Sequence, residues 1–381
     1  MLYLLYHIIN KKAVNSVYLS HLTLHNFRNF KEQSLEFSQD GALFRGLNGS
    51  GKTNLLEAMH VVCTGRSQRA ASRRNMINSS ASCYFIEAGF KNAESGNETI
   101  ASMGFGRDRK SSMKINDKKV SSFSEWFGIA GIVSFGPDDL NLIYGPPHER
   151  RRFVDILISQ LVPGYLGHCV HYRKSLLNRN KLLGMKICDM QLDAYEEKMA
   201  FHGAELAEKR NEIIRKVESQ FTEFYRQISR NKETGTIKFQ PSFSSEFNSK
   251  KEWKYLFLEA LKNTRKQDCN LGYSSIGPHR DDVRITIDGR PARNFGSLGQ
   301  CRSLSLALRL CSYYSLKENS GDSMILLVDD VFSELDDQRL KHFYPLIESG
   351  GQLFATASTS RVPFSKPIHP FTISDGKVCA G

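Results

Sequence analysis

The sequence predicts an α/β fold with a mostly helical second lobe. A glycine-rich loop, residues 46–53, stands between an apolar strand and a helix with an apolar face. A second apolar run, residues 324–328, predicts a buried strand that ends in two aspartates. Residues 165–266 show mostly helical patterning. Buried strands joined to helices at one place and a long helical region at another predict an α/β core with a separate helical part.

The composition describes an ordinary globular protein. The 381 residues, of which 40% are hydrophobic and 24% charged, are enough for two domains or for one domain with a large insertion. A net charge of +12 favours a polyanionic partner, either a nucleic acid or an anionic membrane. No apolar run approaches the roughly eighteen residues of a membrane span, so we expect no membrane insertion. The eight cysteines form no CxxC pair or His/Cys cluster, which predicts neither a zinc site nor a disulfide framework.

The chain begins with an extension followed by two strands. Residues 17–24 and 33–37 alternate between apolar and polar side chains, which predicts two strands joined by a turn. The segment before them, residues 1–16, is a poor signal peptide because Lys11 and Lys12 follow its apolar run instead of preceding it. We therefore do not expect this segment to be a secretory signal.

The glycine-rich loop has the pattern GxxxxGKT between a strand at residues 42–44 and a helix at residues 54–62. Its glycines let backbone N–H groups surround phosphate oxygens, and the N-terminus of the helix adds a positive dipole end. Lys52 would reach the β and γ phosphates, and the Thr53 hydroxyl would ligate Mg²⁺. The motif predicts a nucleoside triphosphate site, and the alternative is a chance glycine turn before a helix. The predicted nucleotide contacts in this loop are Gly46, Asn48, Gly49, Ser50, Gly51, Lys52, Thr53 and Asn54.

The middle of the chain predicts a small sheet and then helices. Short alternating segments between residues 84 and 115 predict an antiparallel sheet. Prolines and glycines between residues 135 and 147 mark a boundary. Beyond it, apolar residues recur at steps of three, four or seven from Leu192 to Ile228, which predicts one long amphipathic helix. We favour internal packing over a partner site for this stripe.

The strand predicted at residues 324–328 ends in Asp329 and Asp330. Asp329 at the carboxyl end of the strand can hold Mg²⁺ through water, and Asp330 can orient or deprotonate the attacking water. The predicted metal ligands are therefore Thr53 and Asp329, and the predicted catalytic residues are Lys52 and Asp330.

A glycine and serine turn, residues 297–300, leads into a predicted helix at residues 304–316. The Ser297 hydroxyl and the Gly299 amide stand at the N-terminus of that helix, where an anion is favoured. The turn therefore predicts a second anion site. One more buried strand is predicted at residues 353–356.

Motifs along most of the chain resemble those of a known family. They are Asn26–Asn29, Gly51–Ala58, Pro137–Leu140 with Gly145–Asp155, Gly277–Asp282 and Ser297–Arg302. On these motifs the chain resembles the RecF family of bacterial recombination mediators, which is similar to the SMC-type ATP-binding-cassette ATPases. The motifs GPHRDD and GxPxxRRxFxD are far more specific than the phosphate loop.

The resemblance implies an ATP-binding-cassette (P-loop) ATPase head from residues 17–135 and 275–381, with a mostly helical lobe at residues 136–274. It implies ATP and Mg²⁺ as cofactors. It also implies that Ser297, Gly299 and Gln300 contact the γ-phosphate of ATP held by the other subunit of an ATP-dependent homodimer. These three residues and the phosphate-loop residues 46 and 48–54 together are the predicted cofactor contacts.

The implied function is ATP-driven dimerisation on gapped DNA or at single-strand/double-strand junctions. The partners implied are RecR and RecO and, indirectly, RecA, which they help to load on the single strand. DNA repair, DNA replication, the SOS response, a cytoplasmic location and slow DNA-stimulated ATP hydrolysis follow from the same resemblance. A rival reading is an SMC-like scaffold that binds ATP without significant turnover. A transporter subunit is a second rival, but GPHRDD has no place in one.

Two expected residues of cassette ATPases are missing from their usual places. The segment 133–138 contains no metal-sensing Gln, and the strand at 353–356 ends in Thr where a switch His is usual. The residues that fill these two roles stay unassigned. Residues 1–16 also have no counterpart in the family pattern, so they are an N-terminal extension, and the alternative is that the protein starts at Val17 from a GTG codon.

Arginines in two segments are hypotheses for DNA-backbone contacts, with a structural or solvated role as the open alternative for each. Asp155, three residues after Arg152, can pair with it within one helix instead. The arginines are Arg66, Arg69, Arg73, Arg74, Arg150, Arg151 and Arg152.

Overall fold

The chain forms two compact units, one made from both ends of the sequence and one from its middle. The first unit comprises residues through Asp138 and residues from Ser312 onward, and the second comprises residues 139–311. Residues 275–311 were predicted to belong to the ATPase lobe. In the structure, their contacts place them in the second unit. The predicted extension, residues 1–16, lies outside the described residues. This computed structural model describes residues 17–69, 72–120, 126, 129–187, 190–230, 232–243, 250–320, 324–331, 335, 337–348, 350–357 and 368–380.

An antiparallel sheet forms one layer of the first unit, with strand order β2-β1-β4-β5-β6-β7. The predicted sheet between residues 84 and 115 is confirmed, and the first two strands of the chain extend it. Alternation along β1 buries Leu22 and Leu24 on the covered face, and a register shift between Leu19 and His21 lets Leu19 join the same core cluster. The strands are β1 Val17–Phe27, β2 Phe30–Glu36, β4 Cys83–Asn92, β5 Glu98–Gly106, β6 Ser111–Ile115 and β7 Lys118–Lys119.

A mainly parallel sheet forms the second layer, with strand order β15-β14-β3-β13-β12-β8. Every residue of β12 and β13 is buried, which matches the continuous apolar runs that predicted them. Because β3, β12 and β13 are parallel, their carboxyl ends lie at one edge of the sheet. The strands are β3 Gly41–Arg45, β8 Gly131–Phe135, β12 Met324–Val328, β13 Gln352–Ala357, β14 His369–Ser374 and β15 Lys377–Ala380.

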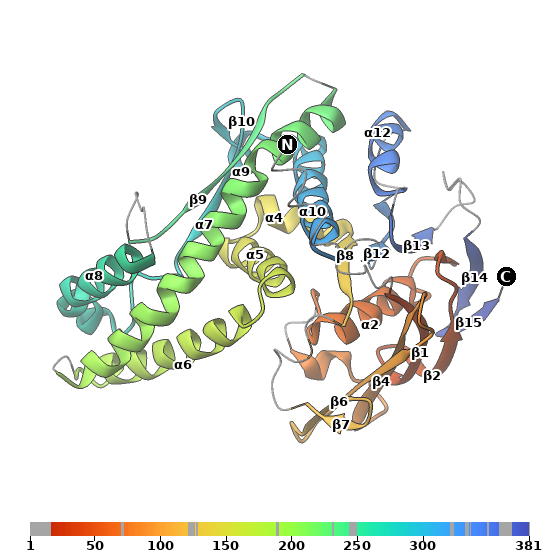
Figure 1. Cartoon of the computed structure of the whole chain (residues 1–381), viewed down its shortest axis with the longest axis horizontal. Helices are drawn as coiled ribbons and strands as arrows, with labels where there is room; N and C mark the ends of the chain where they lie inside the picture. Colours follow the sequence, from red (N-terminus) through yellow and green to blue (C-terminus); the bar gives the residue numbers. More distant parts are fainter. Residues whose placement is uncertain are drawn as a thin grey trace. The chain divides into compact units, whose positions relative to one another are not determined.

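Helix α2, Lys52–Thr64, packs against both sheets and fills the core of the first unit (Figure 1). Leu55, Met59 and Val62 are fully or almost fully buried in that core. The two ends of the chain also meet, since the Val378 N–H donates to the Gln33 side chain at 2.9 Å. The first unit further contains η1 Arg73–Met76 and α12 Asp337–Glu348, and η2 Pro137–Leu140 spans the boundary between units.

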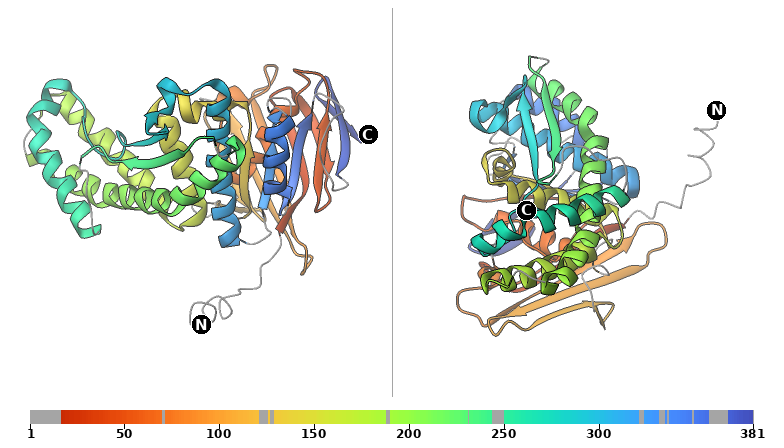
Figure 2. Two further views of the ribbon diagram at one scale, coloured as in Figure 1. Left: turned by 90° about the horizontal axis from the view of Figure 1, so that it is seen from above. Right: turned by 90° about the vertical axis from the view of Figure 1, so that its left-hand side faces the viewer.

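The second unit is mostly helical, around the long helix α7, Asp193–Ser229. The predicted amphipathic stripe is confirmed as packing, because α7 lies against α6, α8 and β9 (Figure 2). A three-stranded sheet of order β11-β10-β9 completes the unit. The elements of the second unit are α4 Asn141–Tyr144, α5 Pro147–Leu161, α6 Tyr165–Gly184, η3 Met190–Leu192, α7, β9 Gly235–Gln240, α8 Lys250–Leu271, β10 Asp282–Ile287, β11 Arg290–Pro291 and α9 Ala292–Phe295. Helix α10, Leu298–Ser320, begins in the second unit and ends in the first.

Two expectations drawn from composition have different outcomes. Across the part of the chain that the structure describes, the helices are too short or too polar to cross a lipid bilayer. The cysteine spacing predicted no disulfide framework, whereas Cys269 is disulfide-bonded. A single bond of this kind depends on tertiary proximity, which cysteine spacing does not reveal. The free cysteines among the described residues are Cys63, Cys83, Cys169, Cys301, Cys311 and Cys379.

Candidate functional site

The glycine-rich loop joins β3 to α2 in a conformation that requires glycine. Gly49 and Gly51 have φ angles of 81° and 117°, in the left-handed region that glycine adopts without strain. A Cβ on Gly51 would lie 2.4 Å from the Asn29 amide nitrogen. Gly51 is also the N-cap of α2, and no side chain caps the helix. The first N–H groups of α2 therefore lack a side-chain acceptor, which is the condition for binding an anion there.

Lys52 is the buried cation of this loop. Only 4% of its surface is exposed. Its ammonium donates to the Gly46 carbonyl at 2.8 Å and to the Leu47 carbonyl at 3.1 Å, and it forms no ion pair with the described residues. An ammonium group has three donors, so one donor and the full positive charge remain for an anion.

The end of β12 faces the start of α2. The Thr53 hydroxyl donates to Asp329 Oδ1 at 3.1 Å, and the Thr356 hydroxyl at the end of β13 donates to the same oxygen at 2.9 Å. The structure thus brings together two residues 276 positions apart in the sequence. Burial raises the pKa of the Asp329 carboxyl above its usual value, the two hydroxyl donors lower it, and the charge of Asp330 raises it further. A carboxylate in this setting gains from a nearby cation.

Asp330 follows in an uncommon backbone conformation. Its φ is 49°, in the left-handed region that costs non-glycine residues energy and that clusters at functional sites. Its N–H donates to the Thr356 hydroxyl at 2.8 Å, so Thr356 connects the two aspartates.

Asn29 supports the loop from the turn between β1 and β2. Its amide donates to the Ser50 carbonyl at 3.0 Å and accepts a hydrogen bond from the Asn54 amide at 2.8 Å. Asn29 and Thr356 received no role from the sequence. A usable signal was available for Thr356, because it ends a buried parallel strand, and side chains at such ends converge at one edge of the sheet.

The donor set of Thr53 and Asp329 fits Mg²⁺, which takes oxygen ligands and usually keeps waters and substrate phosphates in its shell. A site of this kind needs few protein ligands. It is consistent with the finding that the described residues contain no group of three or more His, Cys, Asp or Glu placed to hold a metal ion.

The glycine and serine turn at residues 297–300, which we call the signature turn, belongs to the second unit and caps α10. The Ser297 hydroxyl accepts the Gln300 N–H at 3.3 Å, and Gln300 Oε1 accepts the Ser297 N–H at 2.6 Å. This reciprocal pair is a capping box. The Gln300 amide also donates to Glu233 at 2.5 Å, and the hydroxyl of Tyr225 donates to the other oxygen of that carboxylate at 2.6 Å. Gly299 lies between the two capping residues, in the first turn of the helix.

Comparison with known proteins identifies the family. Residues 18–363 match the family described as "RecF/RecN/SMC N terminal domain". The chain is 34% identical over 360 residues to the DNA replication and repair protein RecF of Natranaerobius thermophilus, covering 92% of this chain and 93% of the relative. It is also 34% identical over 348 residues to RecF of Halalkalibacterium halodurans, covering 90% and 93%. The chain belongs to the RecF family.

Solved structures agree with this family. A structure described as the recombination mediator protein RecF with ATP in the RecFOR pathway superposes with a TM-score of 0.88 at 32% identity, over 97% of this chain and 99% of that chain. An Smc head domain from Pyrococcus furiosus superposes with a TM-score of 0.54 at 17% identity and shows the fold alone. The predicted fold class, an ATP-binding-cassette ATPase head with a mostly helical second lobe, is confirmed.

The two motifs that are most specific to the RecF family bind each other inside the second unit. Arg150 of GxPxxRRxFxD donates to both carboxylate oxygens of Asp282 in GPHRDD, at 2.7 and 3.0 Å. Arg151 donates to the Asp281 backbone carbonyl at 2.5 Å. Arg210 of α7 bridges Asp155, at 2.8 Å, and Asp281, at 3.1 Å. These bonds tie α5, α7 and β10 together, and they give a structural role to Arg150, Arg151 and Asp155 of the first motif and to Asp281 and Asp282 of the second.

The DNA-contact hypothesis is therefore wrong for Arg150, because its side chain is buried and its donors are engaged within the second unit. Arg151 is partly buried and uses one donor on the Asp281 carbonyl. In the first unit, Arg69 pairs with Asp138 at 3.3 Å and Arg74 donates to the Arg107 carbonyl at 2.9 Å. The hypothesis stays a prediction for Arg66, Arg69, Arg73, Arg74, Arg151 and Arg152.

Proposed function

We propose that this protein is an ATP-dependent DNA-binding protein of recombinational gap repair. It binds Mg²⁺-ATP, dimerises on gapped DNA or at single-strand/double-strand junctions, and with RecR and RecO helps to load RecA. Its ATP hydrolysis is slow and stimulated by DNA, and it acts in the cytoplasm. One observation carries this proposal. Thr53 and Thr356 converge on a single oxygen of Asp329, in the same unit as a buried Lys52 that has only carbonyl partners among the described residues.

The site residues of the first unit have different roles in ATP binding. The uncapped start of α2 and the ammonium of Lys52 bind the phosphates, because both offer unused donors in a buried setting. Asn29 holds the loop in its observed conformation through Ser50 and Asn54. Thr53 and Asp329 would hold Mg²⁺, which would neutralise charge on the β and γ phosphates.

Asp330 positions the attacking water and accepts its proton. Its backbone is fixed through the bond of its N–H to Thr356, whose hydroxyl in turn donates to Asp329. Thr356 therefore couples the metal-supporting aspartate to the catalytic one. Thr356 thus stands near the position where cassette ATPases usually carry the switch histidine, and it contacts both aspartates there.

The signature turn completes the site from a second copy of the chain. Ser297, Gly299 and Gln300 present an exposed helix N-terminus to the γ-phosphate, and the capping box pre-forms that N-terminus. Large apolar side chains flank both surfaces that would meet. Phe295 and Leu298 are 66% and 52% exposed beside the turn, and Leu47 in the phosphate loop is 85% exposed. Exposed apolar groups around a polar centre are typical of a protein interface.

A DNA-stimulated ATPase assay tests the proposal. Hydrolysis should be slow without DNA and several-fold faster with gapped duplex, with a smaller gain for blunt duplex of equal length. The Asp330→Asn variant is the control for contaminating ATPases. ATP binding with hydrolysis that no DNA structure changes would contradict the mediator function and favour an ATP-binding scaffold.

A further inference from the structure

Three side chains of the second unit, those of Tyr225, Glu233 and Gln300, form a relay that ends at the signature turn. Gln300 Oε1 accepts the Ser297 N–H at 2.6 Å, and Gln300 Nε2 donates to Glu233 at 2.5 Å. The Tyr225 hydroxyl donates to the other carboxylate oxygen of Glu233 at 2.6 Å. Because Tyr225 lies on α7, the relay connects the start of α10 to the long helix of the same unit.

The charge of Glu233 decides how the Gln300 amide is oriented. An ionised carboxylate only accepts hydrogen bonds, so the amide nitrogen of Gln300 has to face it. The amide oxygen then faces the Ser297 N–H, which needs an acceptor. Without the carboxylate the amide could turn over, and its nitrogen would face another N–H group. Glu233 thus selects the one orientation of Gln300 that closes the capping box.

The closed capping box leaves particular donors of the turn unused. The Ser297 hydroxyl accepts the Gln300 N–H at 3.3 Å, so its own hydrogen remains available. Leu298 and Gly299 are the first two residues of α10, and N–H groups at these positions have no acceptor within a helix. Since Ser297 and Leu298 are exposed, these donors stand together at a helix N-terminus that an anion can reach.

Glu233 is itself fixed by its neighbours. Tyr225 is fully buried, and burial together with the bond to Glu233 raises the pKa of its hydroxyl, which therefore stays a donor. The next residue, Thr234, donates its N–H to the Asp288 side chain at 2.8 Å and accepts the Asp288 N–H at 2.9 Å. Gly235 lies so close to the Tyr225 ring that an added Cβ would come within 2.8 Å of it. Packing and hydrogen bonds thus hold the carboxylate in place.

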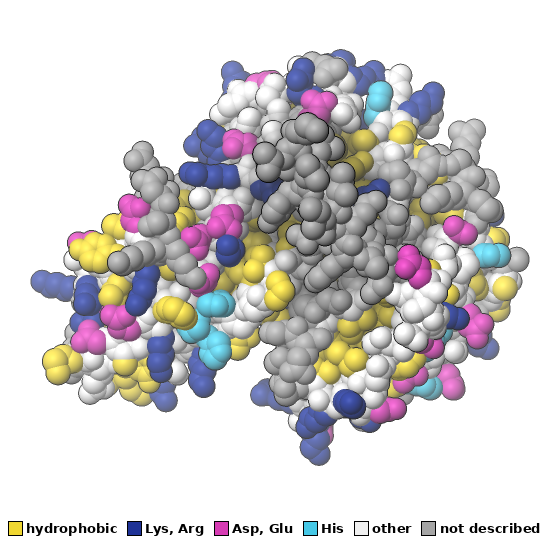
Figure 3. Space-filling view, viewed as in Figure 1, with side chains coloured by type: hydrophobic (Ala, Val, Ile, Leu, Met, Phe, Trp, Pro, Cys, Tyr) yellow, Lys and Arg dark blue, Asp and Glu magenta, His cyan; other side chains and the backbone are white. Residues whose placement is uncertain are grey.

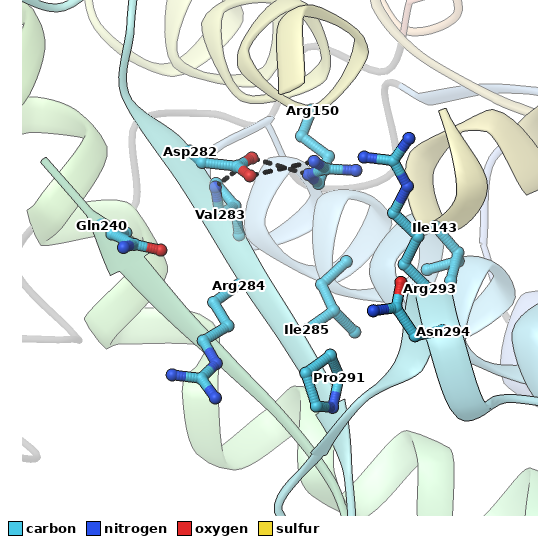
Figure 4. A pocket seen from close by; sticks show the side chains of 10 residues that line it. All are labelled: Ile143, Arg150, Gln240, Asp282, Val283, Arg284, Ile285, Pro291, Arg293 and Asn294. Atoms are coloured by element: carbon cyan, nitrogen blue, oxygen red, sulfur yellow. Dashed lines mark hydrogen bonds and ion pairs between the residues drawn. The ribbon is translucent and has the colours of Figure 1, made fainter. Parts of the chain in front are cut away.

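The chain upstream of the turn is held by different contacts. Helix α9 leads into the turn and lines a pocket of about 240 Å³ beside β10 (Figure 4). Neither Glu233 nor residues 297–300 line that pocket. The Tyr144 hydroxyl donates to the Gly296 carbonyl at 3.1 Å just before the turn. A substitution at Glu233 therefore leaves these upstream contacts in place.

Glu233 also differs from an ordinary surface acid. On the face drawn in Figure 3, Asp and Glu are interspersed with Lys and Arg, and acids in such a surface need no specific role. Glu233 is half-buried, and both of its oxygens accept hydrogen bonds from neutral side chains. In the part of the chain that the structure describes, it forms no ion pair. Its carboxylate therefore orients its donors and does not balance a cation.

We propose that Glu233 is a positioning residue of the signature turn. It fixes the Gln300 amide and, through it, the capping box that keeps the Ser297 hydroxyl and the first N–H groups of α10 available to a phosphate group. That this group is the γ-phosphate of ATP on another copy rests on the proposed function. The positioning itself does not, because all of its bonds lie within one unit of one chain.

The first measurement needs no nucleotide. Hydrogen exchange of the segment at residues 297–300 is followed by mass spectrometry in the wild type, Glu233→Ala, Glu233→Gln and the control Glu223→Ala. Glu223 is an exposed acid of α7 whose bonds are to the same helix. Glu233→Ala should exchange the Ser297 N–H about 10-fold faster, since a charge-assisted bond that supports its acceptor is lost. Glu233→Gln should have a smaller effect, because its amide oxygen can still accept from Gln300. Unchanged exchange in Glu233→Ala, or an equal change in the control, would overturn the proposal.

The second measurement uses ATP. Glu233→Ala should keep ATP binding by the monomer, since its phosphate loop is intact, and its kcat should fall about 10-fold, whereas Glu223→Ala should behave as wild type. Mixing Glu233→Ala with Lys52→Ala should restore part of the rate, because one of the two shared sites then combines an intact loop with an intact turn.

The opposite result would come from a different role. If Glu233 acted as a negative charge beside the phosphate, Glu233→Ala and Glu233→Gln would both strengthen ATP-dependent association and raise the rate, and this result would overturn the proposal. A wild type that neither dimerises nor hydrolyses ATP would count against the proposed function, and the exchange measurement would still decide the role of Glu233.

Discussion

Two regions of the molecule bury cations in opposite ways. In the first unit, Lys52 is buried with carbonyl oxygens as its partners, and no described carboxylate pairs with it. In the second unit, Arg179 is fully buried between Glu196, at 3.0 Å, and Asp268, at 2.7 Å. Arg210 is buried between Asp155 and Asp281.

The difference shows how to separate binding residues from structural ones. A buried charge is costly unless something compensates it. Where the chain supplies the counter-charge, the cation holds the fold together. Where the chain does not, a ligand has to supply it, and the cation belongs to a site. By this criterion we expect the paired arginines of the second unit to be structural and Lys52 of the phosphate loop to bind a ligand.

The largest expected effect is on the structural side. Arg210→Ala would leave the buried Asp281 and the partly exposed Asp155 without their cation, which costs about 3–5 kcal/mol of unfolding free energy. Urea unfolding followed by far-ultraviolet circular dichroism measures it. Arg226→Ala is the control, because it lies on the same helix and its pair with Glu223 is exposed at 4.0 Å. It should change the unfolding free energy by about 0–1 kcal/mol. Equal effects of both substitutions would show that counter-charge does not explain the buried arginine.

Asp330→Asn should lower kcat for ATP by about 10²- to 10⁴-fold, the range for loss of a general base, while ATP binding persists. An ATP-bound dimer should then accumulate. Size-exclusion chromatography with ATP detects it, with the same run without ATP as reference. A variant that stays monomeric would mean that Asp330 is misassigned or that nucleotide does not drive association.

Lys52→Ala should weaken ATP binding by about 10- to 100-fold, since charge-assisted bonds to phosphate are lost. Unfolding stability should change little, because no carboxylate among the described residues loses its partner. Equilibrium binding of labelled ATP measures the first effect, and Lys91→Ala on the exposed face of β4 is the control. Unchanged affinity would remove the lysine from the site.

The smallest effect concerns pH. Burial lowers the pKa of His279 to about 4, and the ring lies between the Tyr172 hydroxyl and the Ser274 carbonyl. The unfolded chain takes up a proton near pH 6.5, whereas the folded ring stays neutral until about pH 4. Stability should therefore be retained above pH 6.5 and lost as pH falls toward 4, by about 1 kcal/mol between pH 7 and 5.5. His279→Gln should show a smaller loss over the same interval. An identical loss would assign the pH dependence to other groups.

The sequence predicted the parts of this molecule that depend on short-range order. The phosphate loop is contiguous, so its strand, glycines and helix could be recognised together. The placement of Asp329 beside Thr53 could also be predicted, because the carboxyl ends of parallel buried strands lie at one edge of the sheet, and the phosphate loop follows one of those strands.

The roles of the remaining residues depend on which side chain stands opposite. Arg150 was predicted as a possible DNA contact, because the sequence does not show that it binds Asp282, which lies 132 positions later. A residue's own type gives its charge, but only tertiary structure shows whether that charge is compensated.

The central claim is that one ATP is bound by the phosphate loop of one copy and the signature turn of another. Ser297→Arg should keep ATP binding and lose hydrolysis, because a bulky cation blocks the turn that would approach the γ-phosphate. Lys52→Ala should also lose hydrolysis, because it damages the phosphate loop, which is the other half of the shared site. Mixing the two variants makes heterodimers in which one site is damaged twice and the other is intact. The measurement is the ATPase rate of this mixture against each variant alone. Partial recovery of activity is the predicted result, and no recovery, with heterodimers shown to form, would contradict the claim.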